Sequence, residues 1–213
     1  MASGISVVTT TFNERENIKE LILRIRSVLS SFQYEVIVVD DNSSDGTLNE
    51  AKLYADIAVG KVREGQTKGL WHGMKLAKFP TIITIDSDLE NNPEFIPVLI
   101  EKLINFDLVV ASRTILPRFS EQLASKTLGK MLGVSDFFSN FRAYKKETIA
   151  ENLKGGETFG GELLVVAKEN GFRIGEVFFE PPNRRRRPRI GGKIRANLRI
   201  INATLKCFII YLF

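Results

Sequence analysis

Short apolar runs alternate with amphipathic stretches along the chain. The runs are rich in valine and isoleucine, as is typical of strands buried on both faces of a sheet; they lie at 5–9, 35–39, 57–62, 81–85 and 108–112. The stretches between them carry apolar residues at helical spacing; they lie at 15–29, 46–54, 68–78 and 93–104. Because strands and helices alternate, we expect an α/β fold with a mostly parallel central sheet covered by helices.

The second half of the chain continues this pattern. We expect a segment near 141–144 to make the sheet mixed, and to be followed by a helix at 160–170 and a strand at 175–179. No Gly-x-Gly-x-x-Gly sequence follows the first strand. A dinucleotide-dependent dehydrogenase therefore loses its main sequence support.

Two carboxylates leave the strand at 81–85 in the tripeptide Asp86-Ser87-Asp88. Ligands of open α/β sheets gather at the carboxyl ends of the strands. Alternate residues of an extended segment point the same way, so Asp86 and Asp88 can offer oxygen ligands to one Mg²⁺ or Mn²⁺ ion. The same tripeptide also suits a solvated turn, and its context has to decide between the two.

A second acidic cluster, at 40–47, follows the strand at 35–39. We expect its later residues, Asp45 and Thr47, to form a turn and a helix cap. Asp40 and Asp41 differ, because adjacent carboxylates repel unless a cation or a hydrogen-bond donor offsets them. The ribose or base of a nucleotide offers such donors.

Four segments occur in an order that is specific to one family; they are Thr-Phe-Asn-Glu at 11–14, Val-Asp-Asp-Asn-Ser-Ser-Asp-Gly-Thr at 39–47, Asp-Ser-Asp-Leu-Glu at 86–90 and Ser-Asn-Phe-Arg-Ala at 139–143. With them the chain resembles the family 2 glycosyltransferases of the GT-A fold, and within that family the dolichyl-phosphate mannose synthases. The resemblance runs from about residue 5 to residue 193. It implies a Rossmann-like GT-A fold and transfer of a sugar from a nucleotide-sugar donor.

The resemblance also implies where the donor and its metal bind. Phe12 lies against the base, in place of the usual tyrosine, and keeps a stacking face without the hydroxyl. Asp86 and Asp88 hold the metal, with Glu90 at a position where glutamine is common. Because a metal there neutralises the charge that develops on the leaving diphosphate, Asp88 is a catalytic candidate. The other donor-binding residues implied by the resemblance are Thr10, Glu14, Val38, Asp40 and Ser87.

Arginines supply the remaining phosphate contacts, because the planar guanidinium matches phosphate oxygens in pairs. Arg113, a catalytic candidate, matches a phosphate-binding arginine of the synthases. Arg118 lies in the loop where a second is expected, with Lys126 as its rival. Arg187 and Lys193 match the Arg-x-x-Gly-x-Ser-Lys element of the synthases, which reads Arg-Pro-Arg-Ile-Gly-Gly-Lys here.

The acceptor decides whether a base is needed. A sugar hydroxyl needs one, and Asp136, beside the segment at 139–142, is the best catalytic candidate. A lipid phosphate is already largely ionised at neutral pH and can attack directly, in which case Asp136 orients basic side chains. Glu162 matches a glutamate of the family, and a structural role is at least as well supported. We expect the lone His72 to be structural, because it has no His or Cys companions.

Composition fits one enzyme domain of 213 residues with 44% hydrophobic residues. The single cysteine, Cys207, and the absence of a signal-peptide pattern predict an intracellular setting. Net charge is +5, but residues 181–213 hold nine of the 30 basic residues and no acidic residue. Because no aromatic residues are interleaved with these arginines and no nucleic-acid motif accompanies them, we expect anionic lipid and not nucleic acid to be the partner.

The end of the chain predicts a basic amphipathic helix. Its apolar stripe consists of Ile194, Leu198, Ile201, Leu205, Phe208 and Leu212, and basic residues recur on another face. A final helix packed on the domain core is the alternative, since amphipathicity alone does not separate the two. We therefore divide the chain into a GT-A domain at 1–193 and a membrane-associating helix at 194–213.

Together these features predict a metal-dependent, inverting glycosyltransferase that moves a hexose, mannose from GDP-mannose, to polyprenyl or dolichyl phosphate at the cytoplasmic face of a membrane. One alternative keeps the enzyme and changes its substrates to a UDP-sugar such as UDP-glucose, or to a saccharide acceptor. A second alternative, from another class, is a nucleotide-binding, membrane-docking protein without catalysis.

Overall fold

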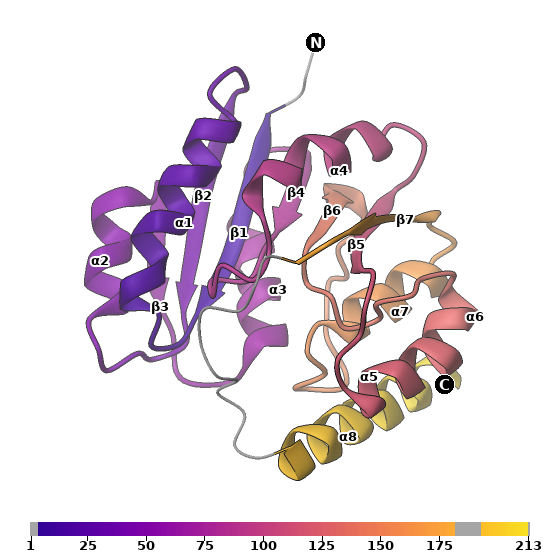
Figure 1. The fold of residues 1–213 in the computed structure, drawn as a ribbon. Coiled ribbons are helices and arrows are strands. Elements are labelled where there is room, and N and C mark those ends of the chain that lie inside the picture. Colours follow the sequence, from indigo (N-terminus) through magenta and orange to yellow (C-terminus); the bar gives the residue numbers. More distant parts are fainter. Residues whose placement is uncertain (1–3, 182–192, 213) are drawn as a thin grey trace.

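The computed structural model describes residues 4–181 and 193–212. Its seven strands are β1 (Ile5–Thr11), β2 (Tyr34–Asp40), β3 (Ile57–Gly60), β4 (Thr81–Thr84), β5 (Leu108–Arg113), β6 (Arg142–Lys145) and β7 (Ile174–Phe179). They form one sheet in the order β3-β2-β1-β4-β6-β5-β7 (Figure 1). All neighbouring pairs are parallel except those of β6, which runs antiparallel to both β4 and β5. The mixed, mostly parallel sheet expected from the sequence is confirmed.

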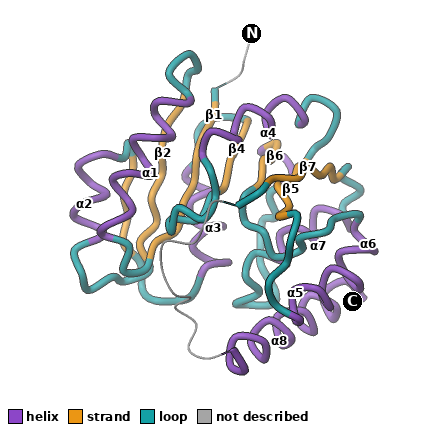
Figure 2. The backbone as a smooth tube through the Cα atoms, viewed as in Figure 1, coloured by secondary structure: helices purple, strands orange, loops and turns teal. Residues whose placement is uncertain are grey.

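Helices cover both faces of this sheet (Figure 2). They are α1 (Arg15–Val28), α2 (Thr47–Tyr54), α3 (Gln66–Leu76), α4 (Ile96–Lys102), α5 (Phe119–Ala124), α6 (Lys130–Leu132), α7 (Gly161–Glu169) and α8 (Lys193–Leu212). One core cluster joins the sheet to α1, α2 and α4, and the other joins it to α3 and α5 to α8. Adjacent residues of β1 belong to different clusters, Val7 to the first and Val8 to the second, because alternate side chains of a strand face opposite ways.

The stretch between β5 and the segment at 135–141 differs from the sequence expectation. The apolar pattern predicts no regular element there, whereas the structure has α5, a π-helical turn at Ser125–Gly129 and α6 in succession. Large apolar side chains of this stretch, Phe119 and Met131 among them, point into solvent. A surface helix is usually recognised by an apolar face toward the core and a polar face toward water. Because this stretch also has apolar side chains on its outer face, that pattern is lost.

Two glycines allow α3 to lie directly against β1. A Cβ atom on Gly69 would come within 2.7 Å of Thr10, and one on Gly73 within 2.4 Å of Val8. Real Cβ contacts are longer than this, so only glycine fits the close approach. As a result the first residue of α3, Gln66, is held beside the carboxyl ends of the central strands.

The expected C-terminal helix is confirmed, and α8 packs on the domain. Its docked side chains are buried, and they are Ala196, Ile200, Ala203, Cys207 and Ile210. The Asn197 side chain also accepts hydrogen bonds from the Ser120 hydroxyl (2.6 Å) and the Ser120 backbone N–H (3.2 Å) at the start of α5. Neither α8 nor any other helix within the described residues is long and apolar enough to cross a bilayer.

The apolar stripe predicted for α8 faces away from the domain. At about 100° per residue, its members lie on the side of the helix opposite the docked residues. Ile194, Leu198, Leu205 and Leu212 are between 55% and 77% exposed, and Phe208 is 37% exposed. Docking on the core therefore accounts for one face of α8 and leaves a second apolar face in solvent.

Candidate active site

The carboxyl ends of β1, β2, β4 and β5 meet at one edge of the sheet, where the strand order reverses between β1 and β4. Ligands of open α/β sheets bind at such a switch point. Three residues other than glycine have left-handed backbones just beyond these strands, Asn13 (φ 55°), Asn42 (φ 66°) and Leu89 (φ 62°). Asparagine adopts this conformation readily and leucine does not, so the turn after Asp88 is strained, as functional turns often are.

The first two strand ends are tied together by Asn13 and Asp40. The Asn13 side chain accepts a hydrogen bond from the Ser44 backbone N–H (3.0 Å), and its own backbone N–H donates to the Ser43 hydroxyl (2.8 Å). Asp40 is buried and accepts hydrogen bonds from Thr11 Oγ1 (2.9 Å) and from the backbone N–H of Ser43 (2.8 Å). Asp40 therefore fixes the loop after β2 against the end of β1.

Asp41 has a separate set of partners in the loop after β3. Lys61 Nζ lies 2.5 Å from Asp41 Oδ1, and the backbone N–H groups of Glu64 and Gly65 donate to its two oxygens. Burial raises the pKa of Asp41, but the hydrogen bond from Lys61 and those from the two backbone N–H groups outweigh it and hold the pKa below its usual value. The repulsion expected between Asp40 and Asp41 is thus relieved within the protein.

Phe12 presents its ring to this same loop. The guanidinium carbon of Arg63 lies 3.7 Å from the centroid of the Phe12 ring, a distance typical of a cation–π contact. The stacking face that the sequence assigns to a base is therefore covered by an exposed arginine side chain. Neither Arg63 nor Lys61 could be predicted as a contact from the sequence, because the two contacts join segments about 20 to 50 residues apart.

Asp86 is held by two amide side chains. Gln66 Nε2 donates to Asp86 Oδ1 at 2.5 Å, and Asn91 Nδ2 donates to Asp86 Oδ2 at 3.0 Å. Desolvation first, and then the nearby charge of Asp88, raise the pKa of Asp86 to about 7. A carboxylate that is this reluctant to ionise gains from a nearby cation.

Asp88 and Glu90 complete the carboxylate group expected from the sequence. Asp88 is exposed, and its Oδ1 accepts a hydrogen bond from the Glu90 backbone N–H (3.0 Å), while Ser87 is buried between the two aspartates. Within residues 4–181 and 193–212, no three His, Cys, Asp or Glu side chains are arranged to hold a metal by themselves. Two neighbouring carboxylates nevertheless fit a hard cation such as Mg²⁺, which usually takes its other ligands from water and substrate phosphates.

The two arginines expected to bind phosphate share a carboxylate. Arg113 donates to Asp136 through Nε (2.6 Å to Oδ2) and Nη2 (3.1 Å to Oδ1), and Arg113 Nη2 lies 3.6 Å from Glu121 Oε1. Arg118 Nη1 donates to the same Glu121 oxygen at 2.7 Å. Burial lowers the pKa of the Arg113 guanidinium, but the charges of Asp136, Glu121 and Asp86 outweigh it and raise that pKa. Arg113 therefore pairs directly with Asp136 and also senses the charge of Asp86.

The other residues predicted for the site are spread over several places in the structure. Thr10 lies at the end of β1 against α3, and Glu14 is buried and accepts a hydrogen bond from Asn17 (2.6 Å). Val38 lies two residues before the end of β2, and its side chain is fully buried in the core cluster that includes α1. Lys126 is exposed on the π-helical turn.

The last three residues considered in the sequence are Arg187, Lys193 and Glu162. Arg187 lies outside the described residues, and Lys193 is described only as the first residue of α8. Glu162 is fully buried and accepts hydrogen bonds from the backbone N–H groups of Lys154 and Gly155, a structural role.

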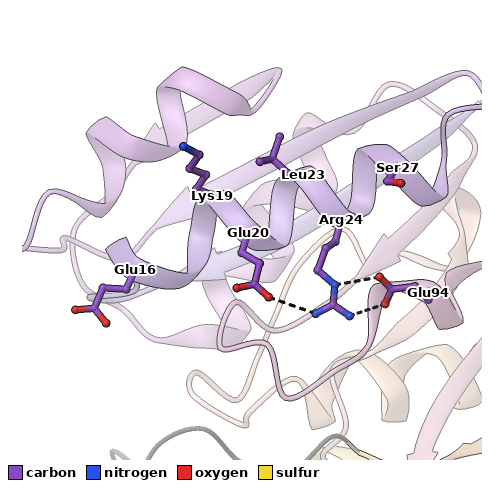
Figure 3. Close-up of a pocket in the computed structure, with 7 residues that line it drawn as sticks. All are labelled: Glu16, Lys19, Glu20, Leu23, Arg24, Ser27 and Glu94. Carbon is purple, nitrogen blue, oxygen red and sulfur yellow. Dashed lines mark hydrogen bonds and ion pairs between the residues drawn. The ribbon is translucent and has the colours of Figure 1, made fainter.

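A surface hollow of about 460 Å³ lies on α1, away from the strand ends (Figure 3). Arg24 crosses it and bonds to Glu94 through Nε (3.0 Å) and Nη2 (2.5 Å). None of the predicted site residues lines this hollow; its lining residues are Glu16, Lys19, Glu20, Leu23, Arg24, Ser27 and Glu94. We therefore place the candidate site at the strand ends.

Sequence comparison identifies the family of the chain. The family described as Glycosyl transferase family 2 matches residues 6–159, a span that includes Asp40, Asp86, Asp88, Arg113 and Asp136. A dolichol-phosphate mannosyltransferase of Pyrococcus furiosus is 35% identical over 165 residues, which cover 68% of this chain and 47% of that protein. An undecaprenyl-phosphate 4-deoxy-4-formamido-L-arabinose transferase of Aeromonas hydrophila is 31% identical over 162 residues, covering 68% of this chain and 50% of that protein. The chain thus spans about half the length of these relatives.

Structural comparison finds the same fold in a solved enzyme. Glucosyl-3-phosphoglycerate synthase of Mycobacterium tuberculosis, in complex with Mn²⁺, UDP and glucosyl-3-phosphoglycerate, superimposes with a TM-score of 0.78 at 26% identity. The match covers 97% of this chain and 81% of that one. The GT-A fold and the family expected from the four sequence segments are confirmed.

Proposed function

Since the chain belongs to glycosyl transferase family 2, we propose that it is an inverting, metal-dependent hexosyltransferase that moves mannose from GDP-mannose to a polyprenyl or dolichyl phosphate at the cytoplasmic face of a membrane. The observation that supports this most directly is the convergence of the Asp86–Asp88 pair with Arg113 at the switch point of the sheet. Asp86 and Arg113 interact electrostatically, and Arg113 is also paired with Asp136 and Glu121.

The donor would lie along the ends of β1, β2 and β4. The base would displace the Arg63 guanidinium from the Phe12 ring and stack there, with Asp40 at the end of the neighbouring strand β2. A divalent ion held by Asp86 and Asp88 would supply charge neutralisation to the leaving diphosphate. Arg113 and Arg118 stabilise the same developing negative charge with fixed, planar donors.

The state of Asp136 supports a phosphate acceptor. Asp136 is 1% exposed and both of its oxygens accept hydrogen bonds from Arg113, so removing a proton from a sugar hydroxyl would cost the ion pair. A phosphate monoester needs no base at neutral pH. The proposed role of Asp136 is therefore to orient Arg113.

The proposed membrane face combines α8 with α5 and α6. The helix α8 packs against α5, and apolar side chains are exposed both on α8 and on the 115–131 stretch, where they are Ile115, Phe119, Leu123 and Met131. Arg195, Arg199, Lys126 and Lys130 are exposed on the same helices. The one acidic residue of these helices, Glu121, is buried and ion-paired. An apolar surface bordered by basic side chains suits an anionic lipid surface.

A UDP-sugar donor is the second candidate within the same enzyme class. The observation in its favour is the likeness to a synthase whose structure contains UDP and Mn²⁺. In that case a saccharide or a soluble phosphate compound could be the acceptor. A docking protein without catalysis is less well supported, since Asp86, Asp88 and Arg113 are all present and close together.

A donor panel tests the proposal. The purified chain is incubated with Mn²⁺, polyprenyl phosphate and one labelled donor at a time, GDP-mannose, UDP-glucose or UDP-N-acetylglucosamine. We expect lipid-extractable label with GDP-mannose. Label from a UDP-sugar alone would move the assignment to the second candidate. If no donor is cleaved, with or without metal, the result would support the docking protein.

A further inference from the structure

We propose that Arg142 is a positioning residue for transfer, and that it fixes the Asp136 loop and through it the orientation of Arg113. The proposal rests on the proposed function, in which Arg113 contacts the leaving or accepting phosphate. Arg142 was singled out in the sequence only as part of a family segment and received no role there.

Arg142 lies in the middle of the sheet at the end that carries the site. It opens β6, where it pairs with Thr84 of β4 and with Val110 of β5. Thr84 is two residues before Asp86, and Val110 is three residues before Arg113. The side chain is 0% exposed, and it is the largest fully buried side chain within the described residues.

The guanidinium of Arg142 joins two loops. Nη2 donates to the backbone carbonyl of Phe137 (3.0 Å), and Nη1 donates to the carbonyl of Gly160 (2.8 Å) and to the Tyr144 hydroxyl (3.3 Å). No carboxylate lies within ion-pair distance of Arg142 in the described parts of the chain. A buried cation is costly unless it is hydrogen-bonded, so this guanidinium is committed to the two carbonyls.

The Phe137 carbonyl belongs to the residue that follows Asp136. The loop around it is fixed elsewhere as well, since the Asp136 backbone N–H donates to Ser112 Oγ (3.2 Å) and Ser139 Oγ donates to the Ala111 carbonyl (2.6 Å). These other contacts hold the loop against β5. Arg142 adds a further contact, which links the loop to the turn that begins α7.

The Gly160 end of the contact is a position that only glycine fits. Gly160 has φ of +77°, which favours glycine, and a Cβ atom there would lie 2.0 Å from Asn140 Oδ1. A lysine at position 142 has a single ammonium and cannot reproduce the fork that spans both carbonyls. Asp136, and with it Arg113, would then lose its fixed position.

The test compares Arg142→Lys with a control at Arg26, whose Nε and Nη2 donate to the Tyr54 carbonyl far from the site. We expect Arg142→Lys to lower kcat for lipid-linked sugar formation about 10- to 100-fold, the size expected for misplaced groups. Donor KM should change less than about twofold, because ground-state donor contacts are retained. Arg26→Lys should leave both constants near wild type.

A double variant separates positioning from simple destabilisation. If Arg142 acts through Asp136, then Arg142→Lys combined with Asp136→Asn should lose little more activity than Asp136→Asn alone. If the fold-loss of the double variant equals the product of the two single-variant losses, the proposal is overturned. A wild-type kcat in Arg142→Lys would also overturn it. Failure of Arg142→Lys to fold would also overturn it, because it would assign Arg142 to the core.

An NMR experiment tests the positioning role of Arg142 separately from the proposed function. The Nε–H signal of Arg113, assigned by its loss in Arg113→Lys, reports the bond to Asp136 without any turnover. We expect that signal to shift and to exchange faster with water in Arg142→Lys and not in Arg26→Lys. An unchanged signal would overturn the positioning role, whereas wild-type protein that transfers no sugar would overturn only the proposed function.

Discussion

Arg113 and Asp136 form a two-point ion pair, with Nε 2.6 Å from Oδ2 and Nη2 3.1 Å from Oδ1. The aspartate is buried and the arginine side chain is 17% exposed, so the pair faces the site through the arginine. A paired guanidinium in this position is fixed before substrate arrives. Preorganised donors of this kind contribute most where charge develops during the reaction.

The first prediction concerns this arginine. Arg113→Lys should lower kcat for transfer by about 10²- to 10³-fold, because a planar two-point donor becomes a point charge. Arg173→Lys is the matched control, since Arg173 also makes a two-point pair, with Asp107, at the opposite end of β5 and β7. Steady-state kinetics with labelled donor measure both variants. Equal kinetics in the two variants would remove Arg113 from the phosphate site.

The second prediction concerns the metal. Asp88→Asn should lower transfer by at least about 10²-fold, because one ligand charge is lost from the cation that neutralises the diphosphate. The fold should be unaffected, since Asp88 is exposed and bonds only locally to Glu90. The free energy of unfolding, measured by thermal melting, should change by less than about 0.5 kcal/mol, as for other surface substitutions. Normal transfer by the folded variant at limiting Mn²⁺ would contradict the metal assignment.

The third prediction follows from the pKa of Asp86, which is raised to about 7 in the folded chain. The folded state therefore binds a proton that the unfolded state releases near pH 4, and the contribution of Asp86 to stability is lost as pH rises from about 4 to about 7. A bound cation favours the ionised form and offsets this loss. The rise in Tm caused by Mn²⁺ should thus be larger at pH 8 than at pH 6.

Asp86→Asn provides the control for that pH dependence. In this variant the rise in Tm with Mn²⁺ should be small at both values of pH. If the wild-type protein and Asp86→Asn respond to Mn²⁺ in the same way across this range, Asp86 does not bind the metal.

The fourth prediction concerns the outward face of α8. Replacing Leu198 and Leu205, which are 60% and 58% exposed, by glutamine should weaken binding to anionic vesicles at least about tenfold, because both side chains leave the apolar surface. Melting should change little. Flotation with vesicles of phosphatidylserine and phosphatidylcholine measures binding, and added salt should weaken it by screening the basic side chains.

Leu53→Gln is the control for the vesicle experiment, since Leu53 on α2 is 72% exposed on another part of the surface. It should float like the wild-type protein. Removal of residues 198–213 is a poorer test, because it also deletes the docked residues Ala203 and Cys207. Undiminished flotation of the double variant would rule out α8 as the membrane contact.

The sequence predicted most of the sheet because its strands are short, apolar and separated by amphipathic helices. It also predicted that the polar residues after the buried strands meet at one edge of the sheet, where we place the candidate site. It did not predict α5 and α6, because the outward-facing Phe119 and Met131 disrupt the apolar pattern of a surface helix. The docked face of α8 was equally hidden, since small side chains such as Ala196 and Ala203 carry little hydrophobic signal.

The contacts that tune the site could not be predicted from the chain. Gln66 reaches Asp86 across 20 residues, and Arg113 reaches Asp136 across 23. Nothing in the local sequence of Gln66 distinguishes it from a surface residue at a helix start. Only the packing of α3 against β1 and the antiparallel insertion of β6 bring such pairs together.

The most direct measurement of the central proposal compares three acceptors in one assay. The 213-residue chain, Mn²⁺ and labelled GDP-mannose are incubated with vesicles that contain a polyprenyl phosphate, the matching polyprenol, or no acceptor lipid together with a soluble saccharide. We predict that label enters the lipid fraction with the polyprenyl phosphate alone, because only this acceptor is ionised without a base. Equal labelling of the polyprenol, or labelling of the saccharide and not of the lipid phosphate, would contradict the account.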